Sequence, residues 1–320
     1  MSEVDPPGRQ REQEQALPAL LAALRSRQYA FVTPTPATHQ RVIARADKSE
    51  ARDLRDVFGW SVPFDPRLLG PELGEIVRQG NLTEPAGDGL VRATVRVSSL
   101  RGDLYVHSAF PTEQEDAVFF GPDSYRFATL IEAEMSRIAP DNLATIVDVG
   151  TGAGVGAIVA KRLCPHGRTV GTDVNPKALR YTAINAAAAG ITVETVLSDT
   201  TGAIETPLDL ALANPPYIVD PKSRTYRDGG DLHGAQVAID MATDVLDQLS
   251  PNGSMILYTG SAIVGGEDRL RAELERLGAR HRRRLSYSTM DPDVFGEELE
   301  HDGYHDVERI EVVSAIFRPL

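Results

Sequence analysis

The 320-residue chain has a single cysteine, Cys164, and no run of about 18 consecutive apolar residues. One cysteine excludes an internal disulfide and a cysteine-based metal site. The lack of a long apolar run predicts that no helix spans a membrane. Residues 1–11 are polar and carry both charge signs, so they lack the basic start and apolar stretch of a secretory signal. Together these absences predict a cytoplasmic protein.

Histidine motifs are also missing. The seven histidines show no His-Glu-x-x-His pattern or other ligand spacing, so the sequence predicts no metal site.

Basic side chains are scarce in the second part of the chain. Residues 1–110 hold 14 Lys+Arg and 14 Asp+Glu, whereas residues 111–320 hold 19 and 32, so the net charge of −13 falls entirely in the second part. Acidic surface repels phosphates, which makes a nucleic acid a less favoured partner; a local basic patch would still allow one.

The periodic segments predict two domains, residues 1–110 and residues 111–320. Helical patterns in the first lie at 16–27, after a Thr38 N-cap, at 49–58 and at 66–82, followed by hairpin strands at 90–98 and 104–108. Three helices and a hairpin are the order of a winged-helix-like module. Such a module can bind DNA, form a homodimer or cap an active site, and its balanced charge favours the last two.

The second domain alternates strands and helices. Expected strands are 145–149, 169–172, 192–197, 208–213, 254–258, 282–288 and 310–317. Expected helices are 154–163, 176–189, 235–249 and 267–277. This order predicts an α/β, Rossmann-like, mostly parallel sheet with both faces covered. Ligands of such sheets bind beyond the carboxyl ends of the strands.

A glycine-rich loop follows the first expected strand. Gly150, Gly152 and Gly154, with Thr151 among them, let the backbone turn tightly and approach a ligand. The alternatives are a relaxed dinucleotide fingerprint and a purely structural strand–helix turn. The acid Asp148 at the strand tip favours a cationic, amino-acid-like ligand, because a carboxylate repels a pyrophosphate.

Acids also follow the next two strands. Asp173 lies 19 residues after Gly154 and can accept hydrogen bonds from ribose hydroxyls. Its alternative role is that of a helix N-cap, which Asn175 can also fill. Asp199 can accept from an adenine amino group or serve as a turn residue.

The fourth strand leads into Asn214-Pro215-Pro216-Tyr217. The prolines stiffen the loop and force Asn214 out of the helical region. The Asn214 side-chain oxygen and the Pro215 carbonyl can each accept a hydrogen bond, which matches the two donors of an NH₂ group. Tyr217 offers a flat face on which a planar acceptor can stack.

Residues 119–260 resemble class I methyltransferases that modify planar nitrogens, most closely the release-factor glutamine methyltransferases and the "small domain" methyltransferases of ribosomal RNA. The resemblance rests on the motifs above and on Gly121–Tyr125, which is similar to the segment that closes over the methionine end of the cofactor. It implies S-adenosylmethionine as cofactor. The implied cofactor-binding residues are Tyr125, Asp148, Gly150, Thr151, Gly152, Gly154, Asp173, Val174, Asp199 and Asn214. The implied catalytic residues are Asn214, Pro215, Pro216 and Tyr217.

The resemblance has limits. The N-terminal part does not look like the helical bundle of the release-factor enzymes, and the region after Met290 is longer than either pattern needs. The resemblance therefore predicts the reaction and the cofactor better than it predicts the substrate. The expected reaction is methylation of a planar amide or amine nitrogen in a protein side chain or a small metabolite. The alternatives are a ribosomal RNA base methyltransferase, a nicotinamide-dependent oxidoreductase and a non-catalytic binding module.

Overall fold

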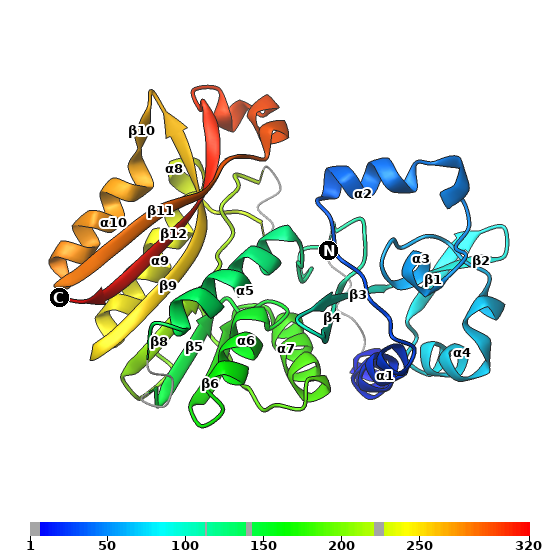
Figure 1. Cartoon of the computed structure of the whole chain (residues 1–320). Coiled ribbons are helices and arrows are strands. Elements are labelled where there is room, and N and C mark those ends of the chain that lie inside the picture. Colours follow the sequence, from blue (N-terminus) through cyan, green and yellow to red (C-terminus); the bar gives the residue numbers. More distant parts are fainter. Residues whose placement is uncertain (1–6, 113, 139–142, 221–226) are drawn as a thin grey trace.

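The computed structural model describes residues 7–112, 114–138, 143–220 and 227–320. A twisted sheet carries helices on both faces, and a smaller N-terminal part, blue to cyan, lies at one side of it (Figure 1). None of the described helices is both long and apolar enough to cross a membrane.

The N-terminal part contains helices and two separate hairpins. Its helices are α1 (Pro7–Ser26), α2 (Pro36–Ile43), α3 (Leu54–Phe58) and α4 (Gly70–Gln79), with the 3-10 turns η1 (Ala46–Lys48) and η2 (Pro66–Leu69). Its hairpins pair β1 (Thr83–Gly87) with β2 (Leu90–Ala93) and β3 (Val95–Leu100) with β4 (Asp103–Ser108).

The prediction of one strand over 90–98 is wrong. The backbone N–H of Thr94 donates to the carbonyl of Leu82 at 2.9 Å, and β2 pairs back onto β1. Asp88 and Gly89 make the turn of this extra hairpin with φ values of 54° and 77°. Left-handed φ at both central residues is what a type I′ turn requires, and Asp-Gly is a strong signal for it, which the sequence prediction overlooked.

Two helix starts also differ from the predictions. The cap of α2 is Thr35, whose side chain accepts from the backbone N–H of Thr38 at 3.2 Å. The helix expected over 49–58 begins only at Leu54, because Asp53 accepts from two N–H groups of its first turn.

The second part confirms the predicted alternation of strands and helices. Its strands are β5 (Thr145–Val149), β6 (Arg168–Asp173), β7 (Glu194–Leu197), β8 (Leu208–Ala213), β9 (Leu249–Val264), β10 (Glu267–Asp268), β11 (Arg283–Val294) and β12 (Arg309–Pro319). Its helices are α5 (Pro122–Met135), α6 (Val155–Leu163), α7 (Pro176–Ala188), α8 (Asp231–Gly234), α9 (Gln236–Gln248) and α10 (Arg269–Arg280), with the 3-10 turns η4 (Gly296–Glu300) and η5 (Asp302–Tyr304).

The sheet is mainly parallel. Its strand order is β11-β12-β9-β8-β5-β6-β7, with β10 paired to β9. The neighbours from β7 to β9 are parallel, whereas β12 runs antiparallel to both of its neighbours, β9 and β11. Strand order reverses between β5 and β8, and ligands of open α/β sheets bind at such a switch point.

Both faces of the sheet are covered. Ile146 and Ile256 belong to one apolar core with α5, α6 and α7, whereas Val147 and Leu257 belong to a second core with α9 and α10. Successive strand residues point to opposite faces, so central strands between two helical layers read as continuous apolar runs.

The N-terminal part packs against α7 and α6. The side-chain oxygen of Asn185, a fully buried residue of α7, accepts from the backbone N–H of Val106 at 2.8 Å, and its amide donates to the Val106 carbonyl at 3.1 Å. Arg162 pairs with Asp103 at 2.6 Å. Apolar residues of the N-terminal part continue into the first core. The domain boundary at residue 110 stays a prediction.

Candidate functional site

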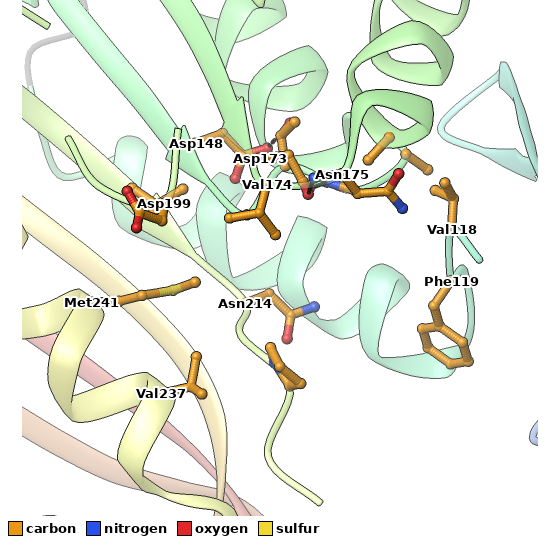
Figure 2. A pocket seen from close by; sticks show the side chains of 18 of the residues that line it. Val118, Phe119, Asp148, Asp173, Val174, Asn175, Asp199, Asn214, Val237 and Met241 are labelled. Atoms are coloured by element: carbon orange, nitrogen blue, oxygen red, sulfur yellow. Dashed lines mark hydrogen bonds between the residues drawn. The ribbon is translucent and has the colours of Figure 1, made fainter. Parts of the chain in front are cut away.

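A cavity of about 590 Å³ opens at the carboxyl ends of β5, β6, β7 and β8. Figure 2 shows Asp148 and Asp173 at the strand ends, with Asn214 below them in this view. The cavity therefore lies at the switch point of the sheet, where the fold favours a ligand.

The glycine loop forms one wall of this cavity. Gly150, Gly152 and Gly154 have φ values of 66°, 56° and 86°. Gly150 and Gly152 line the cavity, and a Cβ on Gly152 would find no atom closer than 4.0 Å. Gly154 does not line it; a Cβ there would come within 3.0 Å of the Thr182 side chain, so this glycine serves the packing of the helix start.

Asp148 holds the loop together from within. Its Oδ2 accepts from the Thr151 hydroxyl at 2.7 Å and from the Ala157 backbone N–H at 2.9 Å. Burial raises the pKa of its carboxyl to about 6. Gly156 permits the close approach, since a Cβ there would lie 2.4 Å from Oδ1. Asp148 borders the cavity and at the same time connects the loop to α6.

Asp173 stands at the end of β6 and lines the cavity. Its Oδ2 accepts from the Gly152 N–H and its Oδ1 from the Asn175 N–H, both at 2.9 Å. Burial raises the pKa of this carboxyl above its ordinary value. The N-cap of α7 is Asn175, which accepts from the Lys177 N–H at 2.9 Å, so the capping alternative for Asp173 is wrong.

The remaining predicted cofactor residues fall into two groups. Val174 and Asp199 line the cavity beside Asp173, and both are exposed. Tyr125 does not line it: its hydroxyl accepts from the Thr33 N–H at 3.0 Å. From the same helix, Ser124 and Phe127 reach the cavity instead. Tyr125 therefore lies outside the cavity lining, and its predicted contact with the cofactor stays a prediction.

The Asn-Pro-Pro-Tyr loop is divided between the cavity and the core. Asn214 and Pro216 line the cavity, whereas Pro215 and Tyr217 are buried and do not. The Tyr217 hydroxyl donates to Asp123 Oδ2 at 2.8 Å. The prediction that Tyr217 presents a stacking face to an acceptor does not fit this position, because the ring packs behind the loop.

Sequence reasoning missed two groups of cavity residues. Val118 and Phe119 precede α5, and the Phe119 side chain is 36% exposed. On the opposite side in Figure 2, α9 contributes Val237 and Met241. The other α9 residues that line the cavity are Asp240 and Asp244. The positions 237, 240, 241 and 244 form one helical face, so their spacing was a usable signal.

Within the described residues, no group of three or more His, Cys, Asp or Glu side chains is arranged to hold a metal ion.

Parts of this chain are similar to known proteins. Residues 130–277 match the family model of the methyltransferase small domain. The release factor glutamine methyltransferase of Cereibacter sphaeroides is 34% identical over 148 residues, which cover 42% of this chain and 51% of that enzyme. The enzyme of the same name from Deinococcus radiodurans is 27% identical over 183 residues, 57% of this chain and 63% of that enzyme. The chain thus spans less than two thirds of the length of these relatives.

Among solved structures, the ribosomal protein L11 methylase of Lactobacillus delbrueckii subsp. bulgaricus is similar with a TM-score of 0.41 and 19% identity, covering 63% of this chain and 81% of that one.

The strand order and the loops at the switch point are those of a class I methyltransferase domain. Residues 130–277 are similar to the methyltransferase small domain. S-adenosylmethionine is the methyl donor of this class of domain.

Proposed function

We propose that this protein is an S-adenosylmethionine-dependent methyltransferase whose acceptor is an amide nitrogen of a protein side chain. The observation that carries the proposal is the position of Asn214, which lines the same cavity as Asp173 and the glycine loop. The matches to release factor glutamine methyltransferases support it.

The residues of the cavity fit S-adenosylmethionine. Gly150 and Gly152 keep one wall free of side chains, and Asp173 and Asp199 offer carboxylates to hydroxyl and amino hydrogens. The acids also suit a ligand with positive charges. A volume of about 590 Å³ is within the usual range of roughly 300–1,000 Å³ for cofactor pockets.

The chemistry needs positioning more than it needs a base. When bound, S-adenosylmethionine supplies a methyl group activated by a sulfonium. An amide nitrogen is a poor nucleophile because its lone pair is delocalised into the carbonyl. The side-chain oxygen of Asn214 would accept a hydrogen bond from the acceptor N–H, which orients the nitrogen and favours electron density on it. Pro215 and Pro216 hold this side chain at the strand end.

Phe119 takes the place first given to Tyr217 as the aromatic wall of the acceptor site. Its ring lines the cavity and is 36% exposed, whereas Tyr217 is 7% exposed and hydrogen-bonded to Asp123. A flat, partly exposed ring suits a planar amide.

A nucleic-acid acceptor is disfavoured by the charge of the cavity wall. Asp228, Asp240 and Asp244 line the same cavity as Asn214, and residues 111–320 carry the net charge of −13. Phosphates approaching this wall would meet repulsion. A peptide carrying a neutral amide meets no such penalty.

The N-terminal part is proposed as a cap that contacts the acceptor. Thr33, Pro34 and Pro36 lie around a small crevice that also borders Val118 and Phe119, so this part reaches the edge of the acceptor site. A homodimer through the same part belongs to the proposal as well. A cytoplasmic location is also part of the proposal, since a chain with one cysteine cannot form an internal disulfide.

Transfer of a labelled methyl group tests the proposal. The protein is incubated with S-adenosylmethionine carrying a tritiated methyl and with fractionated cell extract, with Asn214→Ala as the control. Label in protein, stable to nuclease and recovered on a side-chain amide, is the expected result. Label in RNA or in small molecules would overturn the assigned acceptor, and absence of any transfer would overturn the activity.

A further inference from the structure

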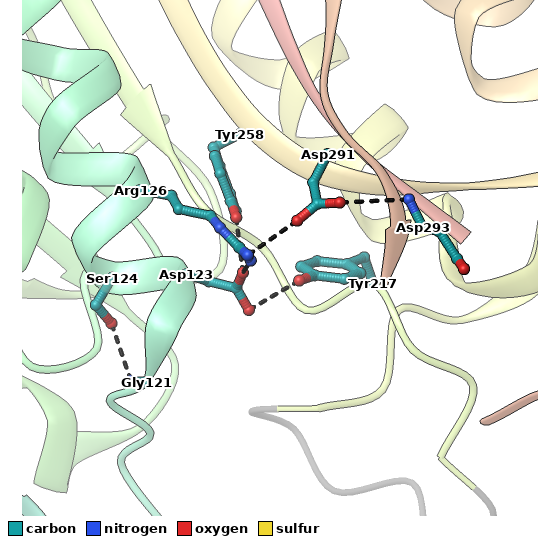
Figure 3. A network of polar contacts seen from close by, with 8 residues as sticks. All are labelled: Gly121, Asp123, Ser124, Arg126, Tyr217, Tyr258, Asp291 and Asp293. Atoms are coloured by element: carbon teal, nitrogen blue, oxygen red, sulfur yellow. Dashed lines mark hydrogen bonds and ion pairs between the residues drawn. The ribbon is translucent and has the colours of Figure 1, made fainter. Parts of the chain in front are cut away.

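A buried carboxylate lies directly behind the acceptor loop. Asp123, the second residue of α5, is 6% exposed. Its Oδ2 accepts from the Tyr217 hydroxyl at 2.8 Å and its Oδ1 from the Tyr258 hydroxyl at 2.6 Å. Arg126 lies 3.4 Å from Oδ1 and pairs with Asp291 of β11 at 2.9 Å (Figure 3). The network joins α5, the acceptor loop, β9 and β11.

Three contacts restrict the Tyr217 ring, and the residue is buried. It packs against β9 at Gly260, where a Cβ would come within 2.1 Å of the ring. Phe295 meets it edge-on, with ring centroids 5.8 Å apart. The hydroxyl, which is the only polar group of the side chain, donates its hydrogen bond to Asp123. Burial and the neighbouring Asp123 charge raise the pKa of Tyr217 well above its ordinary value, so the phenol stays a hydrogen-bond donor.

The tether between this ring and Asn214 is short and stiff. Only Pro215 and Pro216 separate the two residues, and each has a fixed φ. We therefore expect shifts of the ring to be transmitted to the Asn214 side chain. Ser124, which follows Asp123, lines the cofactor cavity, so the first turn of α5 contacts the cavity and the acceptor loop at once.

We propose that Asp123 is a positioning residue for methyl transfer: it fixes the Tyr217 hydroxyl and thereby sets the direction of Asn214 in the acceptor site. This inference rests on the proposed function. Asp123 itself does not line the cavity, so it acts through the loop and does not touch the ligand.

Two substitutions interrupt the contact, and a third is their matched control. Tyr217→Phe removes the donor and keeps the ring; Asp123→Asn removes the charge and keeps the shape. Tyr287→Phe deletes another tyrosine–aspartate hydrogen bond, that of Tyr287 to Asp268 at 2.7 Å, on the sheet edge away from the cavity. Tyr217→Phe and Tyr287→Phe each lose one tyrosine–aspartate hydrogen bond, whereas Asp123→Asn also weakens the contacts of this side chain with Tyr258 and Arg126.

Turnover separates positioning from general destabilisation. Tyr217→Phe and Asp123→Asn should each lower kcat by about tenfold, as expected for one lost hydrogen bond to a charged group. Affinity for S-adenosylhomocysteine should stay within about threefold, and Tyr287→Phe should keep wild-type kcat. The double variant should lose little more than Asp123→Asn alone, because Tyr217→Phe removes a contact that this substitution already weakens.

Hydrogen exchange of the loop gives a readout that does not depend on activity. The backbone amides that flank the two prolines, those of Asn214, Tyr217, Ile218 and Val219, should exchange faster in Tyr217→Phe and Asp123→Asn, and at the wild-type rate in Tyr287→Phe. Unchanged exchange, or faster exchange with wild-type kcat, would overturn the positioning role. A wild-type protein without any methyl transfer would instead overturn the proposed function, while exchange would still decide whether Asp123 holds the loop.

Discussion

The carboxylate of Asp173 accepts a hydrogen bond from the backbone N–H of Gly152 at 2.9 Å, which joins the end of β6 to the glycine loop after β5. Each carboxylate oxygen of Asp173 accepts one backbone N–H and retains capacity for another donor. One side chain thus both shapes the loop and faces the cavity.

Replacing Asp173 by alanine should weaken S-adenosylhomocysteine binding by about ten- to a hundredfold, since charge-assisted hydrogen bonds contribute about 1.5–3 kcal/mol. Isothermal titration calorimetry measures this loss. Glu194→Ala, which removes an exposed acid of β7 that pairs with Arg168, is the control and should bind like the wild type. Wild-type affinity in Asp173→Ala would restrict Asp173 to a role in loop structure.

The raised pKa of Asp148, about 6, makes part of the folding stability pH-dependent. An unfolded aspartate has a pKa near 3.9, so between about pH 4 and 6 the folded protein binds the additional proton. The free energy of unfolding should therefore fall as pH rises through this window, by up to about 3 kcal/mol relative to Asp148→Asn. Urea unfolding at several pH values compares the two proteins. Parallel curves would contradict an elevated pKa at Asp148.

Much of the α/β part could be predicted because the local sequence pattern of each strand agrees with its burial in the folded protein. The apolar runs of β5 and β8 match their burial on both faces, and glycines and acids at strand ends are position-specific signals. The cavity-lining residues Asp173, Asp199 and Asn214 could be predicted because each lies at the end of such a strand or within two residues of it.

The features that could not be predicted from the sequence depend mainly on contacts between distant segments. Nothing local to Tyr217 shows that Asp123 will bind its hydroxyl and place the ring behind the loop. Tyr125 and Ser124 differ by one residue on α5, and only the docking of that helix decides which of them reaches the cavity. The hairpin turn at Asp88–Gly89 was different, since its local signal was present in the sequence and was not used.

Shortening the exposed aromatic at the acceptor wall should raise the acceptor KM. Phe119→Ala removes a ring that lines the cavity and should raise KM by about tenfold, as expected for the loss of about 1.5 kcal/mol of apolar contact. Affinity for S-adenosylhomocysteine should change by less than about threefold. Met290→Ala, which shortens a comparably exposed side chain on β11, is the control. Equal effects of the two substitutions would remove Phe119 from the acceptor site.

Asn214→Ala should abolish most turnover and leave cofactor affinity nearly unchanged. Asn214 lines the cavity from the end of β8, whereas the glycine loop, Asp173 and Asp199 follow β5, β6 and β7. Its amide should therefore face the acceptor, and its hydrogen bond should matter most as the nitrogen begins to take positive charge. Loss of such a preorganised group costs about a hundredfold or more in rate.

Both quantities are measured on the same Asn214→Ala protein, turnover with the labelled acceptor fraction and S-adenosylhomocysteine binding by titration. Binding should remain within about threefold, because that ligand leaves the acceptor end of the cavity free. Normal turnover would mean that the loop is structural and that the planar-nitrogen assignment is wrong. Loss of both turnover and S-adenosylhomocysteine binding would indicate a disturbed loop. Asn214→Asp, which keeps the side-chain shape and one oxygen, would then separate the loop's fold from its chemistry. Turnover that stays low in Asn214→Asp with normal cofactor binding would assign the loss to the amide itself.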